Sequence, residues 1–148
     1  MEIRREKSED TAPAFTGWEQ LYILANHWKS DLEFYKEDLR FLHLLVDKYI
    51  LWVTLPENSE RVREIETKLF ELRKQCKALI KKVSSHTNLL ARLIEKSPEA
   101  NQQAARDAHL QLEELFAHFV KQFRKNRKET FIISEYVIDS ESLAHIIE

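Results

Sequence analysis

Apolar residues recur at alternating three- and four-residue steps along three successive stretches of this chain. Such a heptad pattern gathers the apolar side chains on one side of a helix, which must then be buried against other helices. In the first stretch these residues are Trp18, Leu21, Ala25, Trp28, Leu32, Tyr35, Leu39, Leu42, Val46, Tyr49 and Val53. In the second they are Val62, Ile65, Leu69, Leu72, Cys76, Leu79, Val83, His86, Leu90 and Leu93. In the third they are Ala105, Ala108, Leu112, Leu115 and Phe119, flanked by His109, Phe116 and Phe123. The sequence therefore predicts three long helices packed against one another.

The composition favours an all-α fold in a single domain. The 148 residues include one Gly and three Pro, which leaves few positions for hairpins or irregular loops. A domain of this length buries about two-thirds of the surface of its unfolded chain. The only cysteine, Cys76, belongs to the second apolar pattern, so a disulfide within the chain is excluded.

Capping residues and prolines predict the limits of the first helix. Residues 1–15 carry few apolar side chains and are expected to form a flexible leader. Thr16 and Glu19 have the spacing of a capping box, so the helix is expected to begin at Thr16. It is expected to continue to about Val53, because Pro56 disfavours helical geometry in the residue before it.

The second and third helices are predicted to be joined by a short turn. The second covers residues 59–96, after which Ser97 can cap a third helix that has Pro98 at its first position. The third helix is expected to fade near residues 126–128, where basic side chains suit the negative end of the helix dipole. Short connections make neighbouring helices antiparallel, so residues 16–128 are expected to form an up-down-up bundle.

The segment of residues 129–148 is apolar but harder to assign. Its apolar residues are Phe131, Ile132, Ile133, Tyr136, Val137 and Ile138. These residue types suit a strand, although a lone strand could not satisfy its backbone hydrogen bonds. We expect instead a short helical segment that packs on the bundle as a partial fourth helix, broken near Asp139 and ending at Ile147. The alternative is that this segment packs on a second subunit.

Three histidines are predicted to share one level of the bundle. Folding the helices at the two turns brings His27, His86 and His109 together, with Asp31 and Glu113 each one helical turn from a histidine. Imidazole and carboxylate ligands from facing helices could hold Zn, Fe or Mn. The favoured interpretation is structural, because a single histidine in a core usually forms a hydrogen bond to a carbonyl or carboxylate. The Glu-x-x-His repeats of ferritin-like di-iron bundles and the His-x-x-x-His pair of hemerythrins are absent.

A second row of residues runs along the first helix beside its apolar pattern. Its members mix apolar and acidic side chains: His27, Asp31, Phe34, Asp38, Phe41, Leu45 and Trp52. We expect this row to pack on the carboxy-terminal segment or on a second subunit. The alternative is a groove that binds a small molecule or a peptide. His43 with Asp47, and Glu114 with His118, are expected to be surface pairs on outer faces.

The charge distribution and motifs exclude several functions. Basic residues concentrate on the outward side of the second helix, at Arg73, Lys74, Lys77, Lys81 and Lys82. This basic stripe could bind phosphates of nucleic acid or lipid. The formal net charge of −2 is not that of a nucleic-acid binder, so we expect no nucleic-acid partner.

No secretory signal or membrane span is visible, which predicts a cytoplasmic protein without a membrane partner. No Gly-rich phosphate loop, nucleophile elbow or Cys-x-x-Cys motif points to an enzyme.

The segment of residues 27–41, HWKSDLEFYKEDLRF, resembles the first helix of small, uncharacterised helical proteins of Bacteroidetes. This resemblance implies a helical fold but no activity. The sequence as a whole predicts a non-enzymatic helical interaction or scaffold module without a cofactor, whose partner is a second copy or another helical protein. The competing prediction is a metal-binding bundle that uses the histidine level.

Overall fold

Three helices make up almost all of the described chain. The computed structural model describes residues 12–51, 53–96 and 100–147, and the side chains among them from residue 17 to residue 142. The helices are α1 (Ala12–Ile50), α2 (Pro56–Ile94) and α3 (Gln102–Ile147). None of the residues in these ranges forms a strand, so the predicted all-α class is confirmed.

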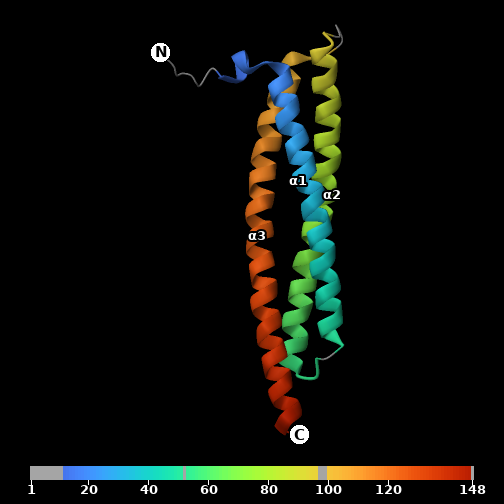
Figure 1. The fold of residues 1–148 in the computed structure, drawn as a ribbon, viewed down its shortest axis with the longest axis vertical. Helices are drawn as coiled ribbons and strands as arrows, with labels where there is room; N and C mark the ends of the chain where they lie inside the picture. The colour runs from blue at the N-terminus through green and yellow to red at the C-terminus, as the bar shows by residue number, and fades with distance from the viewer. Residues whose placement is uncertain (1–11, 52, 97–99, 148) are drawn as a thin grey trace.

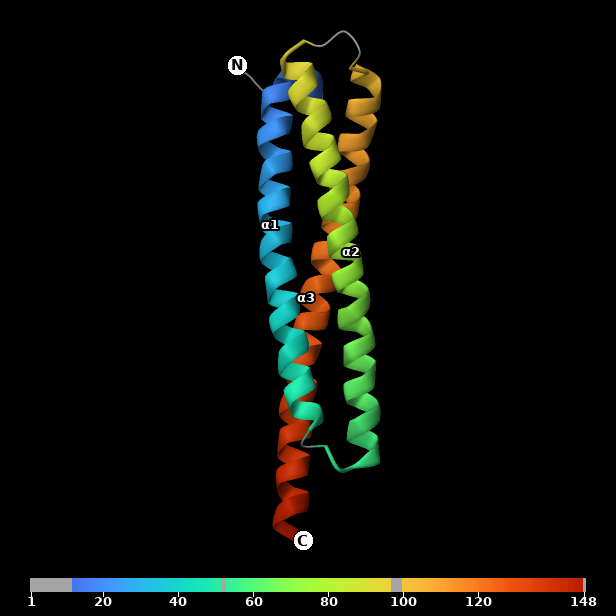
Figure 2. The ribbon, with the colours of Figure 1, turned by 90° about the vertical axis from the view of Figure 1, so that its right-hand side faces the viewer.

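The helices lie side by side along one long axis (Figure 1). The chain reverses direction between α1 and α2 and again between α2 and α3, so that α1 and α3 run the same way. The view in Figure 2 shows that α3 projects beyond the turn that joins α1 to α2. Of the three helix pairs, α1 and α2 form the most extensive contact.

The predicted apolar patterns form the core of the bundle. Every residue of the pattern in α2 is buried, from Val62 to Leu93. On α1 the pattern residues Leu32, Leu39 and Leu42 are fully buried. Each such side chain stabilises the folded state by about 1.5–3 kcal/mol relative to its exposed form. No helix of the described ranges is apolar over a stretch long enough to cross a membrane.

The beginnings of the helices differ in part from the predicted ones. α1 already includes residues 12–15, but it has a break at Gly17, whose φ of 78° suits a residue without a side chain. Residues 1–11 of the predicted leader, and the side chain of Thr16, lie outside the described part of the chain. Leu55 is extended before Pro56, as the proline requires, and Pro56 itself begins α2.

α3 begins later than predicted. It starts at Gln102, and the Oδ1 atom of Asn101 accepts a hydrogen bond from the backbone amide of Ala104 at 3.0 Å. Asn101 therefore supplies the cap that the sequence predicts at Ser97. The predicted cap residue and Pro98 both belong to residues 97–99, outside the described residues.

The predicted end of the third helix near residues 126–128 is wrong, as is the predicted break near Asp139. α3 continues without interruption to Ile147, so the carboxy-terminal segment is the last part of α3 and not a separate helix. The three- and four-residue steps of the core continue through it at Thr130, Ser134, Val137 and Glu141, all of which are buried. Three of these four side chains are polar, which is why the apolar pattern stops before the helix does.

Candidate functional site

The structure places two of the predicted site residues in direct contact inside the bundle. His86 on α2 and His109 on α3 are both buried, and the Nε2 atom of His86 lies 3.0 Å from the Nδ1 atom of His109. The prediction that these two histidines would be neighbours is therefore correct. One of the two nitrogens must carry a proton and the other must accept it for a hydrogen bond to form at this distance.

The surroundings of this histidine pair favour its uncharged form. The indole ring of Trp28 stacks on the His109 ring with 4.7 Å between centroids. Burial, together with the neighbouring His109, lowers the pKa of His86 to about 4. Burial also lowers the pKa of His109, although the charge of Glu113 opposes this effect. The Nδ1 atom of His86 is buried and has no hydrogen-bond partner among the described residues.

The other three predicted ligands do not join this pair. His27 and Asp31 on α1 and Glu113 on α3 are all exposed. On α1 the inward position at this level belongs to Trp28, and adjacent residues of a helix point about 100° apart. The five predicted ligands therefore do not gather at one point, and the two that meet share a hydrogen bond.

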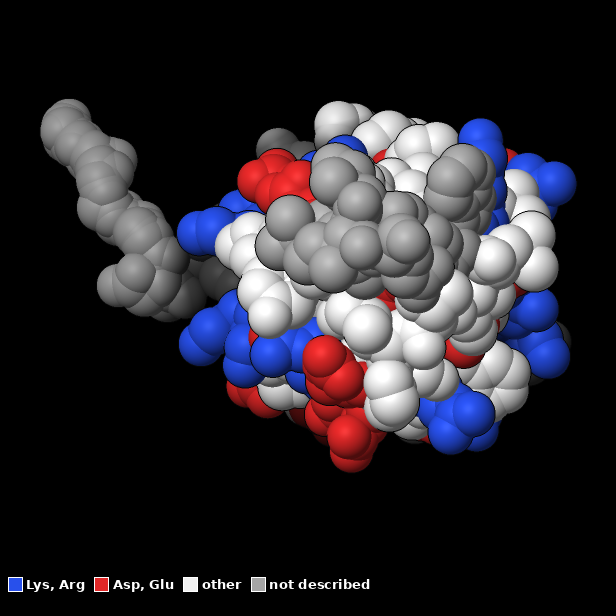
Figure 3. Space-filling view, turned by 90° about the horizontal axis from the view of Figure 1, so that it is seen from below, with Lys and Arg blue, Asp and Glu red and all other residues white. Residues whose placement is uncertain are grey.

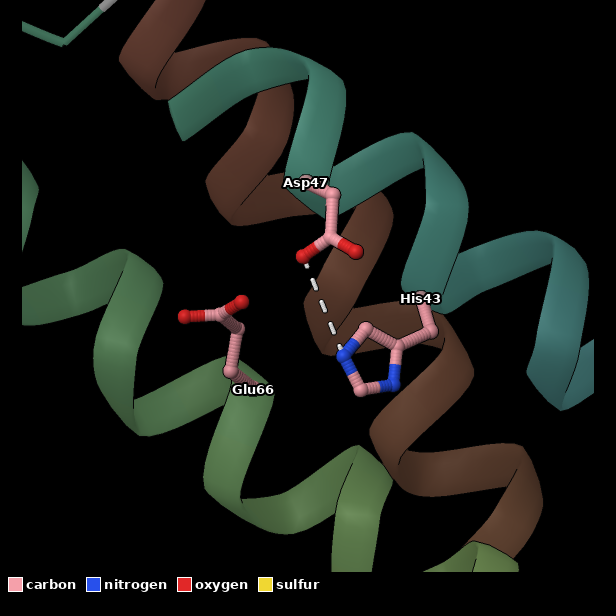
Figure 4. A group of neighbouring side chains, drawn as sticks. All are labelled: His43, Asp47 and Glu66. Atoms are coloured by element: carbon pink, nitrogen blue, oxygen red, sulfur yellow. Dashed lines mark ion pairs between the residues drawn. The ribbon is translucent and has the colours of Figure 1, made fainter. Parts of the chain in front are cut away.

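A different group of possible ligands lies between α1 and α2 (Figure 4). His43, Asp47 and Glu66 each offer one ligand atom, and these three atoms lie within 4.8 Å of one another. The Nε2 atom of His43 lies 3.8 Å from the Oδ1 atom of Asp47, and the Glu66 carboxylate faces them from α2. We call these three residues the outer cluster. No other group of three His, Cys, Asp or Glu residues within the described ranges is as close.

Arg73 fixes the protonation of the His43 ring. Its Nη1 atom lies 3.1 Å from the Nδ1 atom of His43. A guanidinium group can only donate hydrogen bonds, so Nδ1 must accept and the ring proton must be on Nε2. The proton of the neutral ring therefore points toward the Asp47 carboxylate.

The two carboxylates of the outer cluster influence each other. Burial raises the pKa of Glu66, and a hydrogen bond to Asp47 together with the negative charge of Asp47 raises it further. His43 and Arg63 oppose this rise. Two carboxylates so close to each other favour binding of a proton or another cation between them.

Only part of the outer cluster was predicted from the sequence. The four-residue spacing of His43 and Asp47 predicted a pair on one helical face, which the structure has. Glu66 was missed, and Arg73 was predicted only as a member of the basic stripe and not as a neighbour of His43. Both come from α2, and a single sequence does not show which residues of two helices lie at the same level.

The predicted basic stripe of α2 is partly engaged within the molecule. Arg73 is bound to His43, and the Nζ atom of Lys74 lies 3.9 Å from a carboxylate oxygen of Glu71. Seen from the carboxy-terminal end of α3, basic and acidic side chains lie on several sides of the bundle without forming one continuous basic patch (Figure 3).

A buried carboxylate holds the turn between α1 and α2. Glu141 of α3 is only 3% exposed, and it accepts hydrogen bonds from the backbone amides of Thr54 and Leu55 at 3.0 and 3.1 Å. The hydroxyl of Thr54 and the side-chain amide of Asn58 donate to it as well, at 2.6 and 2.8 Å. Glu141 therefore ties the last part of α3 to the start of α2 and has a structural role.

No protein family, curated protein or solved structure matches this chain. Its function is therefore inferred from the geometry described above and from the surface of the bundle.

Proposed function

We propose that this protein is a non-enzymatic helical interaction module that self-associates through one face of its bundle. The face lies along α1 and α3, and we define the α1–α3 apolar surface by four side chains: Phe34, Phe41, Phe131 and Ile138. Their exposed fractions are 64%, 53%, 37% and 42%. Large apolar side chains exposed together on a soluble protein are typical of a contact surface.

An ion pair between α1 and α3 supports the grouping of these side chains into one surface. The Nε atom of Arg127 on α3 lies 2.8 Å from the Oδ2 atom of Asp38 on α1. Phe34 and Phe41 lie four residues before and three residues after Asp38, which places all three on the same side of α1. Phe131 lies four residues after Arg127, and the guanidinium group lies 5.0 Å from the centre of its ring.

A second copy of the chain is the occupant that fits this surface best. The sequence predicts that either the carboxy-terminal segment or another subunit covers the mixed row on α1. The carboxy-terminal part of α3 supplies Arg127 to Asp38, yet it leaves the rings of Phe34 and Phe41 more than half exposed. An arginine among aromatic rings at the centre of a patch is also typical of residues that dominate binding energy.

Measurement of the mass in solution tests this proposal. Size-exclusion chromatography with light scattering should give at least a dimer for the wild type at high micromolar concentration. Phe41→Glu should shift the protein to a monomer, because the charge would have to be desolvated in the interface. Phe70→Glu is the matched control, since Phe70 is 54% exposed and lies on α2 outside this surface. A wild-type monomer, or equal masses for both variants, would contradict the proposal.

Metal binding at the predicted histidine level is the second candidate function, with Zn, Fe or Mn as the ion. Its support is the contact between His86 and His109, which supplies two nitrogen ligands at one place. Against it, the two nitrogens already share a proton, and His27, Asp31 and Glu113 are exposed. Metal analysis of protein purified without chelators, compared with His86→Ala, tests this candidate, and an absence of metal in both proteins would end it.

A further inference from the structure

The outer cluster has the composition and spacing of an incomplete metal site. One imidazole nitrogen and two carboxylate oxygens converge from α1 and α2, and the three atoms lie within 4.8 Å of one another. Zinc binds such atoms at about 2.0–2.2 Å, so two ligands of one ion lie about 3–4 Å apart. The Asp47 side chain is 53% exposed, so it has room to rotate and narrow the remaining gap (Figure 4).

We propose that His43, Asp47 and Glu66 bind one divalent transition-metal ion, with Zn²⁺ as the best fit. The ligands would be the Nε2 atom of His43 and one oxygen from each carboxylate, and water would complete a tetrahedral site. The imidazole favours Zn²⁺ over Mg²⁺ and Ca²⁺, which prefer sites made of oxygen ligands alone. This site is independent of the proposed self-association.

The charges of the outer cluster support this assignment. Asp47 and Glu66 together carry two negative charges when ionised, which one divalent ion neutralises.

The hydrogen bond from Arg73 to the His43 ring opposes metal binding at this site. A metal on the Nε2 atom of His43 requires the ring proton to move to Nδ1, where Arg73 now donates its own hydrogen bond. Arg73 must therefore swing away when the ion binds. Its positive charge also disfavours a cation nearby. Removal of the guanidinium group should therefore strengthen metal binding.

Calorimetric titration of the tag-free full-length protein with ZnCl₂ tests the proposal. The wild type should bind one Zn²⁺ per chain, and His43→Gln and Glu66→Gln should each weaken binding by about 10- to 100-fold. His118→Gln is the matched control, because His118 also has a carboxylate four residues away in Glu114, yet no third ligand joins them in the described structure. Its affinity should equal that of the wild type.

Several results would overturn the proposal. These are the absence of saturable binding to the wild type, an unchanged affinity in His43→Gln, or a loss of binding in His118→Gln. Arg73→Met provides a test of the assigned nitrogen, since the variant should bind Zn²⁺ more tightly than the wild type. Weaker binding by Arg73→Met would refute the assignment of Nε2 as the ligand. Circular dichroism of each variant verifies that the fold is retained.

Discussion

Replacement of Glu141 by glutamine should destabilise the protein strongly, although the two side chains have nearly the same shape. One carboxylate oxygen accepts from the amide and the hydroxyl of Thr54, and the other accepts from the amide of Leu55 and the side chain of Asn58. In the Glu141→Gln variant one of these oxygens becomes an NH₂ group. In either orientation of the amide, this group faces a backbone amide that loses its acceptor in a buried place, whereas the hydroxyl of Thr54 can turn to accept from it.

The pKa of Glu141 gives the magnitude of this effect. Burial by itself would raise the pKa of Glu141, but hydrogen bonds from Asn58, Thr54 and Leu55 lower it to about 2. The difference from the ordinary value of 4.5 corresponds to about 3 kcal/mol of stabilisation of the folded state by the ionised form. Loss of one buried hydrogen bond to a charged acceptor gives a comparable figure of about 1.5–3 kcal/mol.

The sign of the pH dependence follows from the lowered pKa. A carboxyl group whose pKa is lower in the folded than in the unfolded state stabilises the protein above the unfolded value. This contribution is complete above about pH 4.5 and is lost as the pH falls through about 2. The glutamine variant has no group to titrate here, so its stability should lack this component of the acid dependence.

Urea unfolding followed by circular dichroism measures both effects. Wild type and Glu141→Gln should be compared at the same low protein concentration, because self-association would add to the apparent stability. The variant should lose about 3 kcal/mol at pH 7, whereas Glu135→Gln, which changes an exposed carboxylate on the same helix, should change the stability by less than about 0.5 kcal/mol. A loss below about 1 kcal/mol for Glu141→Gln would refute the reasoning.

Three further predictions concern single side chains. His86 should remain neutral down to about pH 4 in an NMR titration, and a midpoint near 6.5 would contradict this. Because the unfolded chain binds a proton here and the folded protein does not, the free energy of unfolding should fall by about 3 kcal/mol as the pH falls from 6.5 to about 4. Cys76 is fully buried and burial raises its pKa to about 11, so a thiol reagent should react with it at pH 8 only after unfolding. Asp38→Asn should lower the free energy of unfolding by about 1 kcal/mol or less, because Arg127 is 46% exposed; a loss above about 2 kcal/mol would assign this pair a larger role.

The apolar periodicity was sufficient to predict the core of the bundle. Burial of every predicted residue of α2 follows from the need to hide one stripe of a helix, whichever neighbours it meets. The same argument failed for the last part of α3. Thr130, Ser134 and Glu141 occupy core positions there, and a search for apolar residues does not detect them. Thr130 and Glu141 are tolerated in the core because hydrogen bonds satisfy their oxygens.

The candidate sites were predictable where they depend on a chain turn or on the spacing of residues within one helix. The turn between α2 and α3 set His86 beside His109, because the two residues lie at similar distances along the chain from that turn. The direction in which each side chain points was not predictable to the same degree. Trp28 points into the bundle, whereas His27, one residue earlier on α1, points outward. His27 is therefore not available as a ligand at the histidine level.

Hydroxyl-radical footprinting over a range of protein concentrations tests the central claim most directly, because it reports the exposure of individual side chains. Oxidation of Phe34 and Phe41 should fall by more than half between dilute and concentrated protein, as the α1–α3 apolar surface becomes covered by a second copy. Phe70, which has a similar exposed fraction on α2, should be oxidised equally at all concentrations. Constant oxidation of Phe34 and Phe41, or an equal decrease at all three rings, would contradict the proposed self-association.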